Sequence, residues 1–355
     1  MTKRLAVIAG DGIGPEVVRE ALVTLAAVED VFHPGIQVEH LPYGADHYLR
    51  TGETIPAAEM QRLGSDFDAI LVGALGDPRV PGNEHARDIL LGMRFQLDLF
   101  VNERPARLID ERLTPLKGKT PRDLDLIVFR ENTEGLYVSV GGTFKQGTPD
   151  EIAIAEELNT RKGVERIVRY AFAWATGHGK TRVTMADKAN AIPAHQLWRR
   201  VFDEVGREHP NIQRDTRYID AMAMDLVRTP ESFQVIVTGN LFGDILSDLA
   251  SILVGGLGLA PSANRHPGRV TMYEPVHGSA PQLAGKDVAN PMAAILTLAI
   301  MLDDLGVHEG ARVVEQAVYD AITSGIGTAD VGGTMGTRAV GEWIGRRVRR
   351  GSAAK

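Results

Sequence analysis

Short apolar runs alternate along this chain with longer amphipathic stretches, and this alternation limits the possible folds more than any other feature of the sequence. Strand-like runs lie at 4–9, 68–76, 124–129, 181–186 and 232–239. One helical stretch begins at Gly14, and two others cover 160–176 and 193–208. The Pro-Glu pair directly after Gly14 is typical of a helix start. Strands that alternate with helices predict an α/β fold with a largely parallel sheet.

Size and charge narrow the class of protein. The 355 residues suggest about two domains, although no linker or low-complexity tract marks a boundary. Acidic residues (46) outnumber basic ones (39), which argues against a nucleic-acid partner because such binding relies on clustered Lys and Arg. No apolar run is long enough to cross a membrane, and Asp11 interrupts the first one. We therefore expect no membrane association, no signal peptide and a cytoplasmic location.

The chain contains no cysteine, so any metal ion must use oxygen or imidazole ligands. Asp244 and Asp248, in the segment GNLFGDILSDLA (239–250), lie four residues apart on a predicted helix and share one face. No basic residue occupies a neighbouring helical position, so a cation would relieve their repulsion. Oxygen ligands favour Mg²⁺ or Mn²⁺. Two acids that merely stabilise a helix N-terminus are the alternative.

The glycine loop GDGIG after the first strand is similar to a dinucleotide-binding fingerprint. Its glycines stand at 10, 12 and 14, so the third comes one residue too early for GxGxxG. No acidic residue about twenty positions later ends a second strand convincingly. A cofactor loop and a tight strand-to-helix turn therefore both remain open.

Three arginines near apolar strands are candidates for binding carboxylates. Arg94 and Arg104 flank the segment FQLDLFVNE, and Arg130 precedes ENTEGLYV, which contains Tyr137. A planar guanidinium suits a carboxylate, although solvated surface arginines are more common.

Lys188 and Asp220 each follow a strand-like run. A lysine that is desolvated at a strand end can have its pKa lowered enough to act as a base. An exposed, solubilising lysine is the alternative.

Taken in order, these motifs resemble the isocitrate/isopropylmalate dehydrogenase family of β-decarboxylating dehydrogenases. The resemblance runs from GDGIGPEV at 10 to VANPMAAIL at 288–296. It is most specific in VTGNLFGDILSDLA (237–250), YEPVHGSAP (273–281), DKAN (187–190) and the segment from Arg94 to Arg104-Pro105. It implies a two-domain α/β fold that is not a Rossmann fold, with a shared, mostly parallel sheet. Residues 1–99 plus 256–355 would form a large cofactor-binding domain, and 100–255 a small domain with the dimer interface.

The resemblance also implies roles for individual residues in a homodimer whose active sites are shared between the subunits. Arg94, Arg104 and Arg130 look like the clamp on the carboxylates of a malate. Tyr137 resembles the general acid, and Lys188 resembles the general base supplied by the other subunit. Asp244 and Asp248, with Asp220 from the partner, resemble the ligands of Mg²⁺ or Mn²⁺. The residues that match the cofactor-binding pattern are His277, Gly278, Ser279, Ala280, Gln282 and Asn290.

A few single residues indicate which cofactor and which substrate to expect. Gln282 stands where NAD-dependent members usually have an aspartate, and no lysine replaces it, so we expect NAD without excluding NADP. Leu90 and Leu91 precede Arg94 and can pack against an apolar C3 group, which favours 3-isopropylmalate and a place in leucine biosynthesis. A D-malate/tartrate-type or homoisocitrate dehydrogenase is the alternative within the family. A catalytically silent member is disfavoured because every expected catalytic residue is present.

Overall fold

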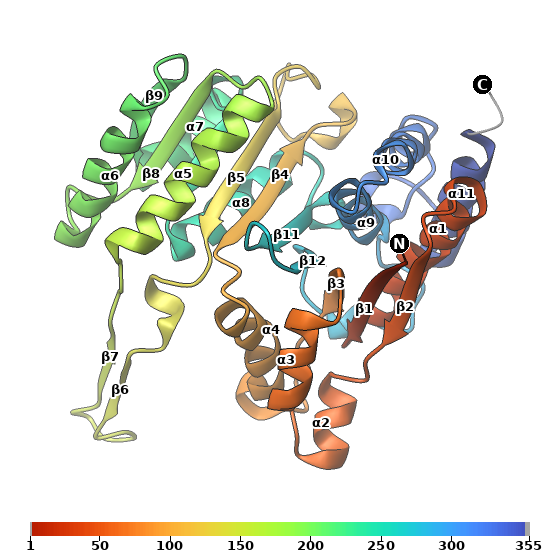
Figure 1. The fold of residues 1–355 in the computed structure, drawn as a ribbon, viewed down its shortest axis with the longest axis horizontal. Coiled ribbons are helices and arrows are strands. Elements are labelled where there is room, and N and C mark those ends of the chain that lie inside the picture. Colours follow the sequence, from red (N-terminus) through yellow and green to blue (C-terminus); the bar gives the residue numbers. More distant parts are fainter. Residues whose placement is uncertain (1, 352–355) are drawn as a thin grey trace. The chain divides into compact units, whose positions relative to one another are not determined.

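The structure, a computed structural model, describes residues 2–351. These residues form two compact units (Figure 1). The first contains the chain up to Leu99, the segment Arg104–Leu124 and the chain from Ser251 onward, and the second contains Phe100–Glu103 and Asp125–Ala250. Both are of the α/β type, and most strand pairs are parallel, so the predicted fold class is confirmed.

The unit boundaries differ from the predicted ones at two places. The prediction gave all of 100–255 to the second domain, whereas Arg104–Leu124 and the chain from Ser251 belong to the first unit. For the earlier segment the reason is apolar packing. Ile109 and Leu113 pack against the first unit's core, and Arg112 donates a hydrogen bond to the carbonyl of Ile322 at 2.9 Å.

The first unit is built on five strands in the order β2-β1-β3-β12-β11, of which only the β11–β12 pair is antiparallel. Its strands are β1 (Lys3–Gly10), β2 (Ile36–His40), β3 (Ala69–Ala74), β11 (Pro261–Arg265) and β12 (Thr271–Pro275). Its helices are α1 (Gly14–Phe32), α2 (Ala45–Thr51), α3 (Ala57–Ser65), α4 (Glu84–Gln96), α9 (Met292–Asp304), α10 (His308–Thr323) and α11 (Thr337–Gly351).

Strand alternation gives this unit two apolar layers. Leu5, Val7 and Leu71 face α1, α9, α10 and α11 on one side of the sheet. Ile8 and Ile70 face the other side, where the buried side chains of α3 and α4 cover them. Helices α1 and α11, from opposite ends of the chain, lie side by side (Figure 1). The first unit is therefore complete only when both ends of the chain are in place.

The second unit has four parallel strands in the order β5-β10-β8-β9. Its elements are β5 (Asp125–Glu131), β8 (Arg182–Asp187), β9 (Gln213–Tyr218), β10 (Val235–Thr238), α5 (Arg161–Gly177), α6 (Gln196–Arg207) and α7 (Ile219–Arg228). The buried faces of α5 and α6 form one apolar core with β5, β8 and β10. Strand β4 (Val101–Arg107) and helix α8 (Asn240–Leu253) contribute residues to both units.

An antiparallel hairpin, β6 (Gly141–Phe144) and β7 (Ile152–Ala155), extends from the second unit (Figure 1). All eight of its strand residues are exposed. Phe144, Ile152 and Ile154 are among them, although apolar side chains are ordinarily buried. The sequence analysis predicted no element here.

Candidate active site

Three of the predicted site residues meet in the second unit where β5 ends. Arg130, 1% exposed, donates from Nη1 to Oδ1 of Asp244 at 2.5 Å. The hydroxyl of Tyr137 donates to the other oxygen of Asp244 at 3.0 Å, and the Arg130 guanidinium lies over the Tyr137 ring. A Cβ on Gly243 would stand 2.6 Å from the Cβ of Arg130, so only glycine allows α8 to come this close. Three functional groups are thus joined around one carboxylate.

The same cluster corrects one step of the sequence argument about Asp244. No basic residue neighbours Asp244 along α8, and the sequence analysis therefore looked to a cation for neutralisation. In the structure Arg130 supplies a positive charge from β5, more than a hundred residues away in the chain. Helical spacing cannot reveal a partner from another element. Asp248 lies one turn further along α8 and is exposed.

Lys188 and Asp220 form a second charged group in this unit. Strands β8 and β9 are parallel neighbours, so Lys188, just after β8, and Asp220, in the first turn of α7, emerge at the same edge. Lys188 Nζ lies 2.5 Å from Asp220 Oδ1. The hydrogen bond from Lys188 is the largest cause of a lowered pKa for the Asp220 carboxyl. The predicted base and the predicted metal ligand are therefore paired within one chain.

The two groups stay separate within the chain. In the part of the chain that the structure describes, neither Lys188 nor Asp220 forms a hydrogen bond or ion pair with Asp244. Among residues 2–351, no three His, Cys, Asp or Glu side chains form a group that could hold a metal ion. The predicted metal site takes only two ligands, Asp244 and Asp248, from one chain and the third, Asp220, from its partner. Carboxylate oxygens remain a donor set that suits a hard divalent cation.

The predicted substrate residues of the first unit lie on α4 and β4. Arg94 Nη2 donates to Glu274 Oε1 at 2.8 Å, and both side chains are buried. Burial raises the pKa of Glu274, but the charge and hydrogen bond of Arg94 and a hydrogen bond from Asn264 outweigh it and lower that pKa. Arg104 is also buried. Glu274 was missed by sequence reasoning because nothing in YEPVHG marks it as the partner of a residue on α4.

The two leucines expected to contact the substrate differ in their surroundings. Leu90 packs, partly buried, against the apolar core below α4. Leu91 is also partly buried. The leucine that follows directly along the helix points about 100° away from the first, so the two cannot serve one surface equally.

The predicted cofactor loop follows β12 and rests on the glycine loop after β1. Ile13 N donates to the carbonyl of Ser279 at 2.8 Å. Gly12 has a φ of +56°, and a Cβ there would stand 2.0 Å from the same carbonyl oxygen. The glycine loop is thus both a tight turn and a support for residues 277–282.

The polar groups of this loop have distinct environments. Burial lowers the pKa of His277, whose Nε2 is buried without a hydrogen-bond partner among the described residues. Asn290 is held in place because Met292 N donates to its Oδ1 and its Nδ2 donates to Asp330. Gly278 and Gln282 are exposed, and Ala280 is half-buried with a φ of +38°. A buried ring nitrogen without a partner fits a loop that completes its hydrogen bonds with a ligand.

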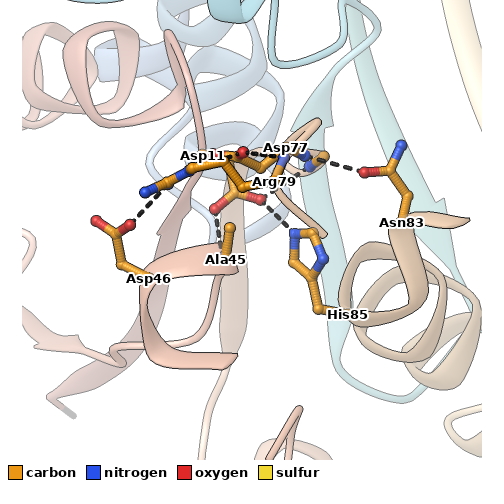
Figure 2. A network of polar contacts seen from close by, with 8 residues as sticks. Asp11, Ala45, Asp46, Asp77, Arg79, Asn83 and His85 are labelled. Atoms are coloured by element: carbon orange, nitrogen blue, oxygen red, sulfur yellow. Dashed lines mark hydrogen bonds and ion pairs between the residues drawn. The ribbon is translucent and has the colours of Figure 1, made fainter. Parts of the chain in front are cut away.

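A buried carboxylate that the sequence analysis missed fixes the glycine loop after β1 (Figure 2). Asp11, 6% exposed, accepts from Ala45 N at 2.6 Å, from Gly76 N at 2.8 Å, and lies 2.8 Å from His85 Nε2. Arg79 joins the neighbouring acids Asp46 and Asp77. One side chain thus connects the starts of α1, α2 and α4 with the end of β3. The signal in the sequence was a single acid inside a glycine loop.

No helix of residues 2–351 is long and apolar enough to cross a membrane.

Comparison with known proteins identifies the family of this chain. The isocitrate/isopropylmalate dehydrogenase family matches residues 4–344. The 3-isopropylmalate dehydrogenase of Thermobifida fusca is 45% identical over 350 residues, 98% of each chain. That of Nocardia farcinica is 46% identical and covers 92% of this chain and 96% of its own.

Solved structures agree with the sequence relatives. The crystal structure of isocitrate dehydrogenase from Methylococcus capsulatus has a TM-score of 0.87 at 36% identity, over 98% of this chain and 100% of the other. A β-decarboxylating dehydrogenase from Thermococcus kodakarensis has a TM-score of 0.80 at 35% identity, over 98% and 97%. The chain therefore belongs to the isocitrate/isopropylmalate dehydrogenase family.

Proposed function

We propose that this protein catalyses the NAD-dependent oxidative decarboxylation of 3-isopropylmalate, as a cytoplasmic enzyme of leucine biosynthesis. Relatives named 3-isopropylmalate dehydrogenase, 45–46% identical over nearly the whole chain, support the reaction and the substrate. The observation that carries the proposal is the cluster in which Arg130 and Tyr137 both contact Asp244. It joins a cation for a substrate carboxylate, a proton donor and an oxygen ligand in one place.

Binding of the dicarboxylate rests on three arginines. Arg94, Arg104 and Arg130 are buried, so their charges are poorly screened by water, and the acids Glu274 and Asp244 hold Arg94 and Arg130 in position. Each guanidinium can offer two parallel N–H groups to a carboxylate. Leu90 packs against the apolar core, so Leu91 would be the main contact of the C3 isopropyl group, and each buried CH₂ contributes about 0.8 kcal/mol.

The protein's own groups carry out the proton transfers. Lys188 of a second copy takes the proton of the C2 hydroxyl as hydride leaves C2, and Asp220 of that same copy lies beside its ammonium. After CO₂ has left, the Tyr137 hydroxyl protonates C3 of the enol. When bound, NAD would accept the hydride and Mg²⁺ or Mn²⁺ would act as a Lewis acid that stabilises negative charge on the substrate. Asp244 and Asp248, with Asp220 of a second copy, would hold the metal.

The cofactor loop fits NAD better than NADP. His277, Gly278, Ser279, Ala280 and Asn290 would bind the adenosine, and the unpaired His277 nitrogen offers a hydrogen bond to it. Gln282 can hydrogen-bond ribose hydroxyls but does not repel a 2′-phosphate as an aspartate would. We therefore expect NAD to be preferred with modest discrimination.

A second copy of this chain completes the proposed enzyme. The hairpin residues Phe144, Ile152 and Ile154 are 44–57% exposed, and Met224 on α7 and Ile245 on α8 are 53–58% exposed. So many large apolar side chains on one unit favour burial against another chain. Sedimentation velocity should give a dimer, and Phe144→Asp together with Ile154→Asp should weaken it.

A substrate panel tests the proposed function. Purified protein is assayed with 3-isopropylmalate, D-malate, tartrate, homoisocitrate and isocitrate, each with NAD or NADP and Mg²⁺ or Mn²⁺. We expect the highest kcat/KM for 3-isopropylmalate with NAD, and no turnover after complete chelation of divalent ions. A higher kcat/KM for homoisocitrate would show that the role given to Leu91 is wrong, and turnover that survives chelation would remove the metal.

A further inference from the structure

The main chain at Lys188 is held from one side by the residue before it. Beyond β8 the chain turns sharply, and the carbonyl of Lys188 accepts from Ala191 N and Ile192 N at 2.9 and 2.8 Å. Asp187, 1% exposed, accepts from Ala189 N at 2.7 Å and from Arg199 Nε at 2.7 Å. These bonds fix the shape of the turn but leave the amide N–H of Lys188 to another partner.

That partner is His195, a buried side chain that the proposed reaction does not use. Lys188 N donates to His195 Nδ1 at 2.9 Å, and His195 Nε2 lies 2.7 Å from Glu157 Oε1. A backbone N–H can only donate, so Nδ1 must be the unprotonated nitrogen and the ring proton must sit on Nε2. His195 is therefore neutral, in one tautomer, and donates to the Glu157 carboxylate.

Glu157 is itself anchored. Its Oε1 also accepts from Asn159 Nδ2 at 3.0 Å, and Asn159 Oδ1 accepts from the buried Trp198 Nε1 at 2.8 Å. The hydrogen bond from His195 is the main cause of a lowered pKa for the Glu157 carboxyl. A chain of satisfied polar groups of this kind holds each member in one orientation.

The next residue reaches the turn that carries Tyr137. Leu158 and Gly135 exchange two backbone hydrogen bonds, of 2.7 and 3.2 Å, and Gly135 immediately precedes the turn Leu136–Val138. A cavity of about 130 Å³ lies here, with Gly135, Leu136, Glu157 and His195 in its wall. Residues 157–158 therefore connect with the backbone of the base on one side and with the turn of the acid on the other.

We propose that His195 and Glu157 are positioning residues that fix the main chain at Lys188 for proton abstraction. This inference rests on the proposed function, because it takes Lys188 as the general base. A misplacement of about 1 Å in a catalytic group can cost roughly a hundredfold in rate. The pair acts through the backbone of Lys188.

Two substitutions at one position separate positioning from mere stability. His195→Leu removes both hydrogen bonds, whereas the side-chain oxygen of His195→Asn can still accept the Lys188 amide. We expect His195→Leu to lower kcat about 10–100-fold with an unchanged KM for NAD, and His195→Asn to recover most of it. Equal losses in the two variants, or an unchanged kcat in folded His195→Leu, would overturn the proposal.

A measurement on the unmodified protein keeps the test independent of folding and of substrate identity. The ¹⁵N spectrum at neutral pH should show His195 with a proton on Nε2 and none on Nδ1, and the Lys188 amide should exchange slowly with solvent. A protonated Nδ1 or a rapidly exchanging Lys188 amide would refute the inference. Absence of turnover with every substrate of the panel would instead refute the proposed function, since these spectra need no substrate.

Discussion

The two units present their candidate site residues in different ways. In the first unit the cofactor loop is shaped by backbone contacts, such as the close approach of Gly12 to Ser279, and the buried carboxylate of Asp11 holds the glycine loop that supports it (Figure 2). In the second unit the candidate groups are charged side chains that contact one another, Arg130 with Asp244 and Lys188 with Asp220. The comparison suggests that the cofactor loop of the first unit contributes shape, whereas the second unit contributes the groups of the proposed proton transfers.

The substitution with the largest expected effect tests whether the second unit supplies the catalytic groups. Lys188→Ala removes the proposed base, and we expect kcat to fall about 10²–10⁴-fold while the affinity for NAD is kept. Steady-state kinetics give kcat, and calorimetric titration gives the Kd for NAD. Lys180→Ala is the matched control, because Lys180 pairs with Asp125 at 2.7 Å just before β8. A weakened NAD affinity in Lys188→Ala alone would break the division between the units.

The next effect concerns the buried ion pair of the first unit. Glu274→Gln leaves the buried Arg94 charge without its partner, and we expect a loss of about 3 kcal/mol in unfolding free energy at pH 7. The folded-state pKa of Glu274 is lowered, so its stabilisation is present above the ordinary carboxyl pKa near 4.5 and is lost as pH falls through the folded-state value.

Urea unfolding at a series of pH values from 7 to 3.5 measures the unfolding free energy of wild type and of Glu274→Gln. The difference in unfolding free energy between wild type and Glu274→Gln should become smaller as the pH falls. Glu208→Gln, which breaks an exposed pair with Arg169, should change the unfolding free energy far less than Glu274→Gln does. A gap that stays constant or widens in acid would contradict the sign derived for Glu274.

A third substitution tests whether the first unit acts through shape. Gly12→Ala pushes a Cβ into the Ser279 carbonyl, and we expect the Kd for NAD to rise about tenfold and stability to fall by about 1–3 kcal/mol. Gly35→Ala is the control, because Gly35 also has a positive φ but open space around its Cβ position. Equal NAD affinities in the two variants would argue against the support role of Gly12.

The smallest effect concerns the choice of cofactor. Gln282→Asp adds a negative charge at an exposed position, and we expect the ratio of kcat/KM for NADP to that for NAD to fall roughly fivefold. Gln282→Ala removes the side-chain hydrogen bonds without adding charge and should change both cofactors alike. If Gln282→Asp leaves the ratio unchanged, the residue does not face the adenosine ribose.

The sequence predicted best what depends on strand ends. Lys188 and Asp220 each follow a strand-like run, and the two meet because the neighbouring parallel strands β8 and β9 end at one edge. The contacts made by Arg130 and Glu274 were not foreseen, since each joins elements far apart in the chain. His195 and Glu157 gave no signal beyond a single histidine and a single acid. The interleaved domains followed from resemblance alone, because no linker marks their boundaries.

The discontinuity of the first unit has a consequence for synthesis. All residues of the second unit have been translated before the 105 residues of 251–355, which belong to the first unit. At about 5–20 residues per second, the ribosome needs roughly 5–20 s to complete them. During that interval α1 and β1 exist without α9 and α11, which later cover their apolar faces. We therefore expect the second unit to fold first and the earlier-made N-terminal segment to require protection by chaperones until the last helix emerges.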